Sequence, residues 1–198
     1  MIVVASSNAH KLAELKRIWA AAGLEFEFRS LADYPGYPEP ADDGRTFAQN
    51  ALIKARAACA YTGLAAVADD SGIEVDLLNG MPGVRSARWA GVGASAQASL
   101  ELLIAQLADT AYEDRTARFN CAMALVAPDG SEQVVSGVMP GHLVLEPQGS
   151  NGFSYDPVFV TDGQSVTNGV LTDAQKDALS HRGQAARALV PYLREALG

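Results

Sequence analysis

The chain has 198 residues, 48% of them hydrophobic, a length and composition that predict one domain over residues 1–198 with a large buried core. Its formal net charge is −8, which argues against nucleic acid as a partner because such binding depends on clustered Lys and Arg. No apolar run approaches the roughly 20 residues of a membrane span.

The cysteine content and the N-terminal residues indicate the cellular compartment of the protein. The two cysteines, Cys59 and Cys121, stand in Ala-rich contexts and are predicted to be reduced core residues. The N-terminal apolar run is too short for a signal peptide and has no basic residues before it. Together these features predict a soluble cytoplasmic protein without a membrane partner.

The first predicted elements are a strand, a turn and a helix. Residues 2–5 form an apolar run typical of a central strand, and apolar residues recur at helical spacing over 12–22. The polar segment 6–11 between them would place backbone N–H groups at a helix N-terminus, which favours anions. The alternative is an ordinary helix cap with a solvated Lys11.

Residues 24–28 alternate like a strand, and the Pro-rich, acidic stretch 31–43 is predicted to be a loop. Thr46 and Gln49 match a capping box, so a helix is expected from Thr46 to about residue 61, ending at Gly63. Lys54 lies two turns into this helix. It is either a solvated side chain or within reach of a site at the N-terminal end.

Two adjacent carboxylates follow the next apolar run. Residues 64–67 predict a short buried strand, and Ala-Asp-Asp-Ser-Gly at 68–72 stands where that strand should end. Asp69 and Asp70 repel each other, so a cation, a basic neighbour, a shared proton or solvent must relieve them. The same composition is also typical of a solvated turn.

The middle of the chain predicts mixed structure. Strands are expected at 73–77, 117–127, 132–138 and 142–145, with a hairpin turn at 128–130 and a helix at 95–107. The irregular segment 84–91 carries two arginines, Arg85 and Arg88, and Trp89, which suit an anion contact or a subunit interface.

A Gly-rich stretch at 149–157 carries two aromatic rings beside a carboxylate. Phe153 or Tyr155 could stack on a planar ring while Asp156 accepts ring N–H groups. The alternative is that both rings enter the core and Asp156 begins a turn. Helices are predicted from Thr172 and from about Ser180, with His181 and Arg182 in the first turn of the second.

Five of these segments occur together in a recognisable order. They are Ser-Ser-Asn-x-x-Lys at 6–11 with Glu14, Thr-Phe-x-x-Asn-Ala-x-x-Lys-Ala at 46–55, Ala-Asp-Asp-Ser-Gly at 68–72, Gly-Phe-x-Tyr-Asp-Pro at 152–157, and Ser-His-Arg-Gly at 180–183. The set resembles the inosine/xanthosine triphosphate pyrophosphatases, the Ham1-like nucleotide hydrolases. The resemblance covers essentially the whole chain.

The resemblance implies an α/β fold with a long mixed β-sheet flanked by helices, in two lobes with an active-site cleft between them. It implies a Mg²⁺-dependent homodimer that hydrolyses ITP, dITP and XTP to the monophosphate and pyrophosphate. Asp70 would be the catalytic carboxylate, and the metal would be held by Asp70, Asp42 and Asp69. The implied substrate-binding residues are Ser6, Ser7, Asn8, Lys11, Lys54, Ser71, Phe153, Ser154, Tyr155, Asp156, Lys176, His181 and Arg182.

Two positions depart from the family pattern. Asp42 and Asp43 stand where members often carry a Glu ligand, with Asp42 in the better register, and Gln49 replaces a common Glu. The alternatives are a pyrophosphatase for modified pyrimidine triphosphates, of the septum-inhibitor class, and a sensor that binds a purine nucleotide without cleaving it. The Ser-His-Arg-Gly segment speaks against the first, and the presence of Asp70 and Lys54 against the second.

Overall fold

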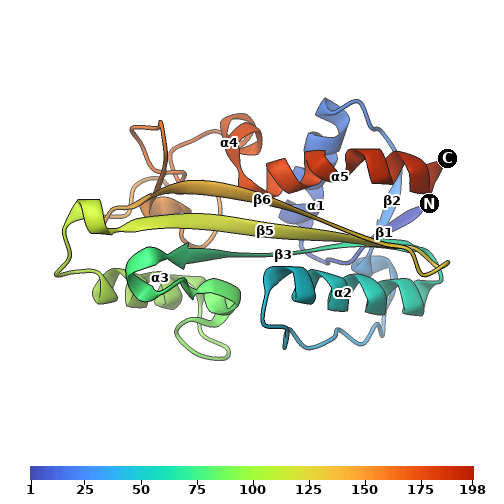
Figure 1. Ribbon diagram of the computed structural model, residues 1–198, viewed down its shortest axis with the longest axis horizontal. Helices are drawn as coiled ribbons and strands as arrows, with labels where there is room; N and C mark the ends of the chain where they lie inside the picture. The colour runs from blue at the N-terminus through green and yellow to red at the C-terminus, as the bar shows by residue number, and fades with distance from the viewer. The chain divides into compact units, whose positions relative to one another are not determined.

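The computed structural model describes all residues 1–198, which form one mixed sheet and flanking helices (Figure 1). The strands are β1 (Ile2–Val4), β2 (Phe28–Ser30), β3 (Ala65–Val75), β4 (Met81–Pro82), β5 (Thr116–Val126), β6 (Glu132–Leu143) and β7 (Phe159–Thr161). The α-helices are α1 (Ala9–Ala21), α2 (Phe47–Thr62), α3 (Ala96–Gln106), α4 (Asp173–Leu179) and α5 (His181–Leu197).

The seven strands pair in the order β2-β1-β3-β5-β6-β7, with β4 attached to β3. Strand β1 is parallel to both β2 and β3, whereas β6 and β7 are antiparallel. The predicted α/β class with a long mixed sheet flanked by helices is therefore confirmed.

The chain divides into two compact units. The first comprises residues 1–70, 121–137 and 181–198, and the second comprises 71–120 and 138–180. Each unit has its own hydrophobic core, and strands β3, β5 and β6 contribute residues to both.

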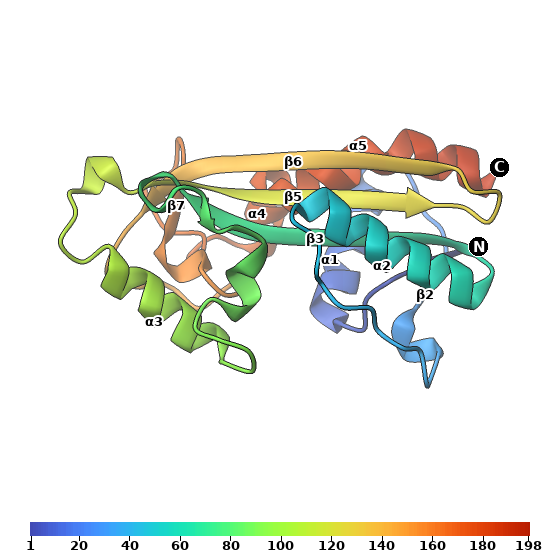
Figure 2. The same ribbon diagram turned by 60° about the horizontal axis from the view of Figure 1, so that its bottom comes forward.

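In the first unit, α1 and α5 lie on one face of the strands and α2 lies on the other (Figures 1 and 2). Ala65 and Val67 belong to the same apolar cluster as residues of α1 and α5. Because side chains alternate along a strand, Asp69 shares their face and Asp70 points to the face that carries α2. The two neighbouring carboxylates therefore have different surroundings.

The core of the second unit combines α3 with residues of β3, β5 and β6. Its fully buried side chains include Tyr155, which lies near the end of the Gly-rich loop, and Phe159, which follows that loop. Short 3₁₀ turns at Gly83–Arg88 and Asp156–Val158 connect elements of this unit.

The structure corrects three expectations. Residues 68–72 are not a turn, because β3 continues through them as one strand of 11 residues. Residues 24–27 precede β2 instead of forming a strand, and residues 142–143 belong to β6. Backbone pairing in the sheet overrides the turn preference of Asp, Ser and Gly at 69–72.

Several local predictions are confirmed. Thr46 caps α2, and Gly63 ends it with φ of 69°. Thr172 and Gln175 form a complete capping box at the start of α4. Both cysteines are buried and free. No helix combines the length and the apolar character needed to cross a membrane.

Candidate active site

The polar segment after β1 folds as a helix cap. The Asn8 side chain accepts the backbone N–H groups of His10 and Lys11 at 3.0 and 3.2 Å, and the Ser6 hydroxyl accepts that of Asn8 at 3.2 Å. The capping alternative therefore holds for Asn8. Ser7 is exposed, and Lys11 is directed to the carboxylate of Asp69.

Asp69 is the buried member of a group of four charges. Its carboxylate lies 3.0 Å from Lys11 Nζ and 3.3 Å from Arg182 Nε, and Arg182 Nη1 donates to Glu14 at 2.7 Å. Burial would raise the pKa of Asp69, but the charges of Lys11 and Arg182 outweigh it and hold that pKa well below the ordinary range. Arg182, which was predicted in the first turn of a helix and implied by the resemblance to bind substrate, is thus fixed between α1 and β3.

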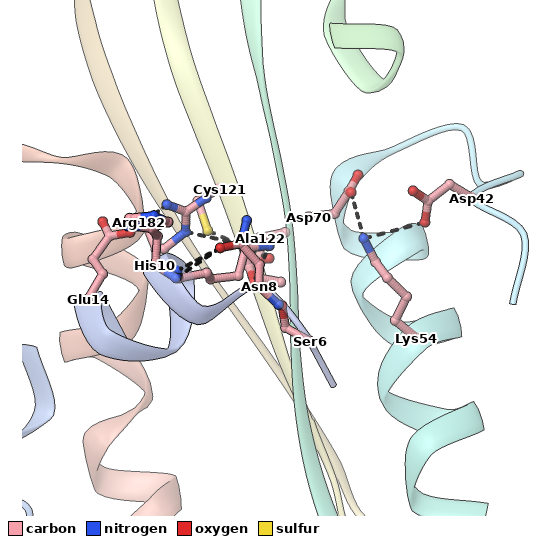
Figure 3. Close-up of polar contacts among 12 residues, drawn as sticks. Ser6, Asn8, His10, Glu14, Asp42, Lys54, Asp70, Cys121, Ala122 and Arg182 are labelled. Atoms are coloured by element: carbon pink, nitrogen blue, oxygen red, sulfur yellow. Dashed lines mark hydrogen bonds and ion pairs between the residues drawn. The ribbon is translucent and has the colours of Figure 1, made fainter. Parts of the chain in front are cut away.

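Asp70 has a different set of partners on the opposite face of β3 (Figure 3). Lys54 Nζ lies 2.8 Å from Asp70 Oδ1 and 3.4 Å from Asp42 Oδ1, so one ammonium contacts two carboxylates. Burial, with a contribution from Asp42, raises the pKa of Asp70, while Lys54 and Asn50 act in the opposite direction. Burial works to lower the pKa of Lys54, but Asp70, Asp42 and Asp69 outweigh it and raise that pKa.

Asn50 connects this carboxylate to the acidic loop. Its amide Nδ2 donates to Asp70 Oδ2 at 3.0 Å, and its Oδ1 accepts the Gly44 N–H at 2.8 Å. Asn50 is completely buried. Sequence reasoning gave it no role, although helical spacing places it on the same face of α2 as the apolar Phe47 and Ala51. A polar residue on an apolar face was the available signal.

The charges on the two faces of β3 differ. Asp69 and Glu14 are balanced by Lys11 and Arg182, whereas Asp42 and Asp70 share the single charge of Lys54 and leave a net charge of −1. Counted over these named residues, only the second group has more carboxylates than cations, which suits an added cation.

Fit to a metal ion can be judged from the oxygen donors. No group of three or more His, Cys, Asp or Glu side chains is arranged to hold a metal. Mg²⁺ is commonly bound by one or two carboxylates with waters and substrate phosphates completing its shell. Asp42 and Asp70, already bridged by the ammonium of Lys54, match that donor set.

In the second unit, the Gly-rich loop presents one ring and buries the other. The Phe153 side chain is 69% exposed, between Gly152 and Ser154, whose φ angles are 83° and 58°. Tyr155 is only 1% exposed and donates its hydroxyl to the Ser86 carbonyl at 2.7 Å. The stacking interpretation thus suits Phe153, and the core interpretation describes Tyr155.

Asp156 is buried beneath this loop. Its Oδ2 accepts the Phe153 N–H at 2.6 Å and lies 2.5 Å from Lys176 Nζ. Of the other predicted residues, His181 is buried at the start of α5 in the first unit, and Ser71 is partly buried in β3 at the start of the second. The structure therefore gathers Asp42, Lys54 and Asp70 in one unit and Phe153, Asp156 and Lys176 in the other.

Comparisons with known proteins identify relatives over the full length. A sequence profile described as Ham1 family matches residues 2–192. The chain is 55% identical to a dITP/XTP pyrophosphatase of Corynebacterium efficiens, over 100% of this chain and 99% of the relative, and 51% identical to one of Streptomyces coelicolor, over 100% and 98%.

Two solved structures also superpose on this chain over nearly its whole length. A HAM1 protein from Coxiella burnetii superposes with a TM-score of 0.87 at 39% identity, covering 98% of each chain. A dITP/XTP pyrophosphatase from Mycobacterium abscessus superposes with a TM-score of 0.78 at 51% identity, covering 97% of this chain and 98% of the other.

Proposed function

This chain belongs to the Ham1 family, and on that premise we propose that it hydrolyses dITP, XTP and ITP to the monophosphate and pyrophosphate. The observation that carries the proposal is the half-buried Asp42–Lys54–Asp70 group, in which two carboxylates share one lysine and leave a net charge of −1. It occurs in a chain that is about half identical to named dITP/XTP pyrophosphatases over its whole length.

Asp70 is assigned the role of general base. Water attacks the α-phosphorus, and the bond from that phosphorus to the bridging oxygen breaks, so that pyrophosphate leaves. One proton of the water passes to an Asp70 oxygen, and the other stays on the oxygen that is now part of the monophosphate. A carboxylate whose pKa is raised by burial is a better proton acceptor than an ordinary Asp. Asn50 donates a hydrogen bond to one oxygen of the Asp70 carboxylate, so this carboxylate is oriented before the substrate arrives.

The phosphate groups need positive charge. Lys54 supplies one cation next to Asp70, and Lys11 supplies another at the start of α1, together with the Ser6–Asn8 turn. Mg²⁺, held by Asp42 and Asp70, would neutralise phosphate oxygens and stabilise the pyrophosphate leaving group. Asp69 remains a prediction as a further ligand; its present partners are Lys11 and Arg182.

Recognition of the base is assigned residue by residue, and the donors to its 6-keto edge remain a prediction. Phe153, whose ring is exposed, is assigned to stacking, with Ser154, Tyr155, Asp156 and Lys176 shaping its surroundings. His181 and Arg182 would donate to the 6-keto oxygen of hypoxanthine or xanthine. Adenine carries an amino group there, so two unpaired buried groups would reject it by about 10² to 10⁴-fold.

A nucleotide panel tests the proposal. Pyrophosphate release is measured with dITP, XTP, ITP, dATP, dGTP and dTTP, with Mg²⁺ and with excess EDTA. We expect release from the first three only, and only with Mg²⁺. Binding of ITP without release would favour the sensor, and preference for a modified pyrimidine triphosphate would favour the septum-inhibitor class.

Asp70→Asn tests the catalytic assignment. We expect kcat to fall by about 10² to 10⁴-fold, the usual contribution of a general base. Asp76→Asn is the matched control, because Asp76 is an aspartate just beyond the end of β3 whose carboxylate pairs with Arg118 instead. Normal turnover by Asp70→Asn would remove Asp70 from the reaction.

A family homodimer is also part of the proposal. Arg88 and Trp89 stand at the end of the Gly83–Arg88 turn and are the residues assigned to the interface. Sedimentation of the wild-type chain should give the mass of two 20.8 kDa subunits.

A further inference from the structure

The loop that carries Phe153 is held in an unfavourable backbone conformation. Gly152 has φ of 83°, and the non-glycine Ser154 has φ of 58°. Between them, the Phe153 ring is 69% exposed, so burial of that ring contributes little to holding the loop. A left-handed non-glycine residue costs of order 1–3 kcal/mol and persists only where surrounding contacts enforce it. Surrounding contacts must therefore hold Ser154 in this conformation.

Asp156 supplies the direct contacts. Its Oδ2 accepts the backbone N–H of Phe153 at 2.6 Å and pairs with Lys176 Nζ, while its Oδ1 accepts from Asn168 Nδ2 at 3.3 Å. Asp156 as a residue is 3% exposed. Its two oxygens are therefore used by three donors of the chain itself, which makes it an anchor for the loop.

Asn168 continues the network away from the loop. The residue is completely buried, and its Oδ1 accepts the hydroxyl of Thr161 at 2.7 Å. An ionised carboxylate can only accept, so the amide must turn its NH₂ to Asp156 and its oxygen to Thr161. The Thr161 hydroxyl must then donate. Each hydrogen bond therefore fixes which group of the next side chain donates and which accepts, from Thr161 in β7 to Asp156 beside the loop.

The backbone on both sides supports the same arrangement. Gly169 N–H donates to the Asp156 carbonyl at 3.0 Å, and Asn151 N–H donates to the Gly169 carbonyl at 2.9 Å. Asn168 thus lies in a segment that is bonded directly to the Phe153 loop. All of these residues belong to the second unit.

We propose that Asn168 and Thr161 are positioning residues, which act through Asp156 to hold the Phe153 loop in the conformation that stacks on the base. Neither residue touches the nucleotide. The consequence for substrate binding depends on the proposed function, whereas the hydrogen-bond chain and its effect on the loop do not. Two independent readouts follow.

The first readout is hydrogen exchange of the Phe153 amide, which donates to Asp156. Thr161→Val keeps the shape of the side chain and removes the hydroxyl that donates to Asn168. We expect the Phe153 amide to exchange roughly three- to tenfold faster, the factor that corresponds to one lost neutral hydrogen bond. Thr161→Ser, which retains the hydroxyl, should restore the wild-type rate.

Thr110→Val is the matched control. Thr110 also donates its hydroxyl at 2.7 Å within the second unit, but to the Leu107 carbonyl. It should lower global stability similarly and leave Phe153 exchange unchanged. Asn168→Ala provides a second route to the same result if Thr161→Val does not fold. Unchanged Phe153 exchange in whichever of these two variants folds overturns the proposal.

The second readout is kinetic. With dITP, Thr161→Val should raise KM roughly three- to tenfold and leave kcat within about a factor of two, because the loss affects binding of the base. In a Phe153→Ala background the same substitution should have no further effect on KM. An equal increase in both backgrounds would show that Thr161 does not act through Phe153.

The two proposals can fail separately. If the wild-type chain hydrolyses none of dITP, XTP and ITP, the proposed function is wrong, and amide exchange alone decides the role of Thr161 and Asn168. If the enzyme is active and both readouts are unchanged in the variants, the positioning role is wrong and the function stands.

Discussion

Two aspartate–lysine pairs illustrate how similar contacts can serve different purposes. In the first unit, Lys54 contacts Asp70 at 2.8 Å and also Asp42, whose side chain is 35% exposed. In the second unit, Lys176 contacts Asp156 at 2.5 Å, and the Asp156 side chain is 4% exposed. The first group carries a net charge of −1, whereas the second is neutral.

The partners of the two carboxylates explain the difference. Asp156 has a lysine, a backbone N–H and an amide, so its capacity to accept is largely used within the chain. Asp70 has a lysine and an amide and retains lone pairs for a cation or a proton. A buried, neutral pair stabilises a loop, while a half-open, negatively charged group is suited to chemistry.

The largest expected effect comes from removing Lys176, with the removal of Lys54 as the comparison. Lys176→Met would leave the buried Asp156 charge uncompensated and should lower the free energy of unfolding by about 3–5 kcal/mol. Lys54→Met should lower it by about 1 kcal/mol, because the Asp42 side chain is 35% exposed and solvent screens its charge. Denaturant unfolding measures both. Equal losses would mean that the two pairs do not differ as described.

Gly152 and Gly63 offer a matched test of the second unit's tight packing. Both have positive φ, and Ala at either should cost about 1–2 kcal/mol of backbone strain. A Cβ at Gly152 would also lie 2.3 Å from Asp156 Oδ2, whereas nothing lies within 4 Å at Gly63. Gly152→Ala should therefore destabilise by a further 1–3 kcal/mol or so, as measured by denaturant unfolding. Equal destabilisation by Gly152→Ala and Gly63→Ala would show that the loop around Gly152 shifts at little cost to accommodate a Cβ.

Substitutions of Asp42 and Asp43 test the Asp42–Lys54–Asp70 group of the first unit. Asp42→Asn should raise the Mg²⁺ concentration for half-maximal pyrophosphate release by about tenfold to hundredfold. Asp43→Asn should change it little, because Lys54 contacts Asp42. A larger effect of Asp43→Asn would transfer the ligand role to that residue.

The smallest effect concerns Tyr155, in the buried part of the second unit. Burial raises the pKa of Tyr155 to about 12, above the value of about 10 for an unfolded chain. The neutral hydroxyl therefore contributes stability that is complete below about pH 10 and is lost as the pH rises towards 12. Between pH 9 and 11, the Tm of the wild type should fall more than that of Tyr155→Phe.

Tyr61→Phe is the control for this measurement because the Tyr61 ring is exposed. Its Tm should follow the wild type through the same pH range. Parallel curves for the wild type and Tyr155→Phe would show that the hydroxyl of Tyr155 ionises freely in the folded protein.

Local patterns predicted much of the secondary structure. The ends of α2 and the start of α4 could be placed because caps such as Thr46, Gly63 and Thr172 act on their immediate neighbours. The same reasoning failed at residues 68–72, where pairing within the sheet outweighs the turn preference of the residues. Strand β7 was missed because its three residues carry too short a pattern.

The sequence by itself determined which polar segments matter, because each follows a strand or begins a helix and together they match one family. Only the tertiary structure decided how they divide the work. Alternation along β3 separates Asp69, neutralised by Lys11 and Arg182, from Asp70, which shares Lys54 with Asp42. Burial likewise made Asp156 an anchor and recruited Asn168 and Thr161, whose roles depend on contacts between residues distant in the chain.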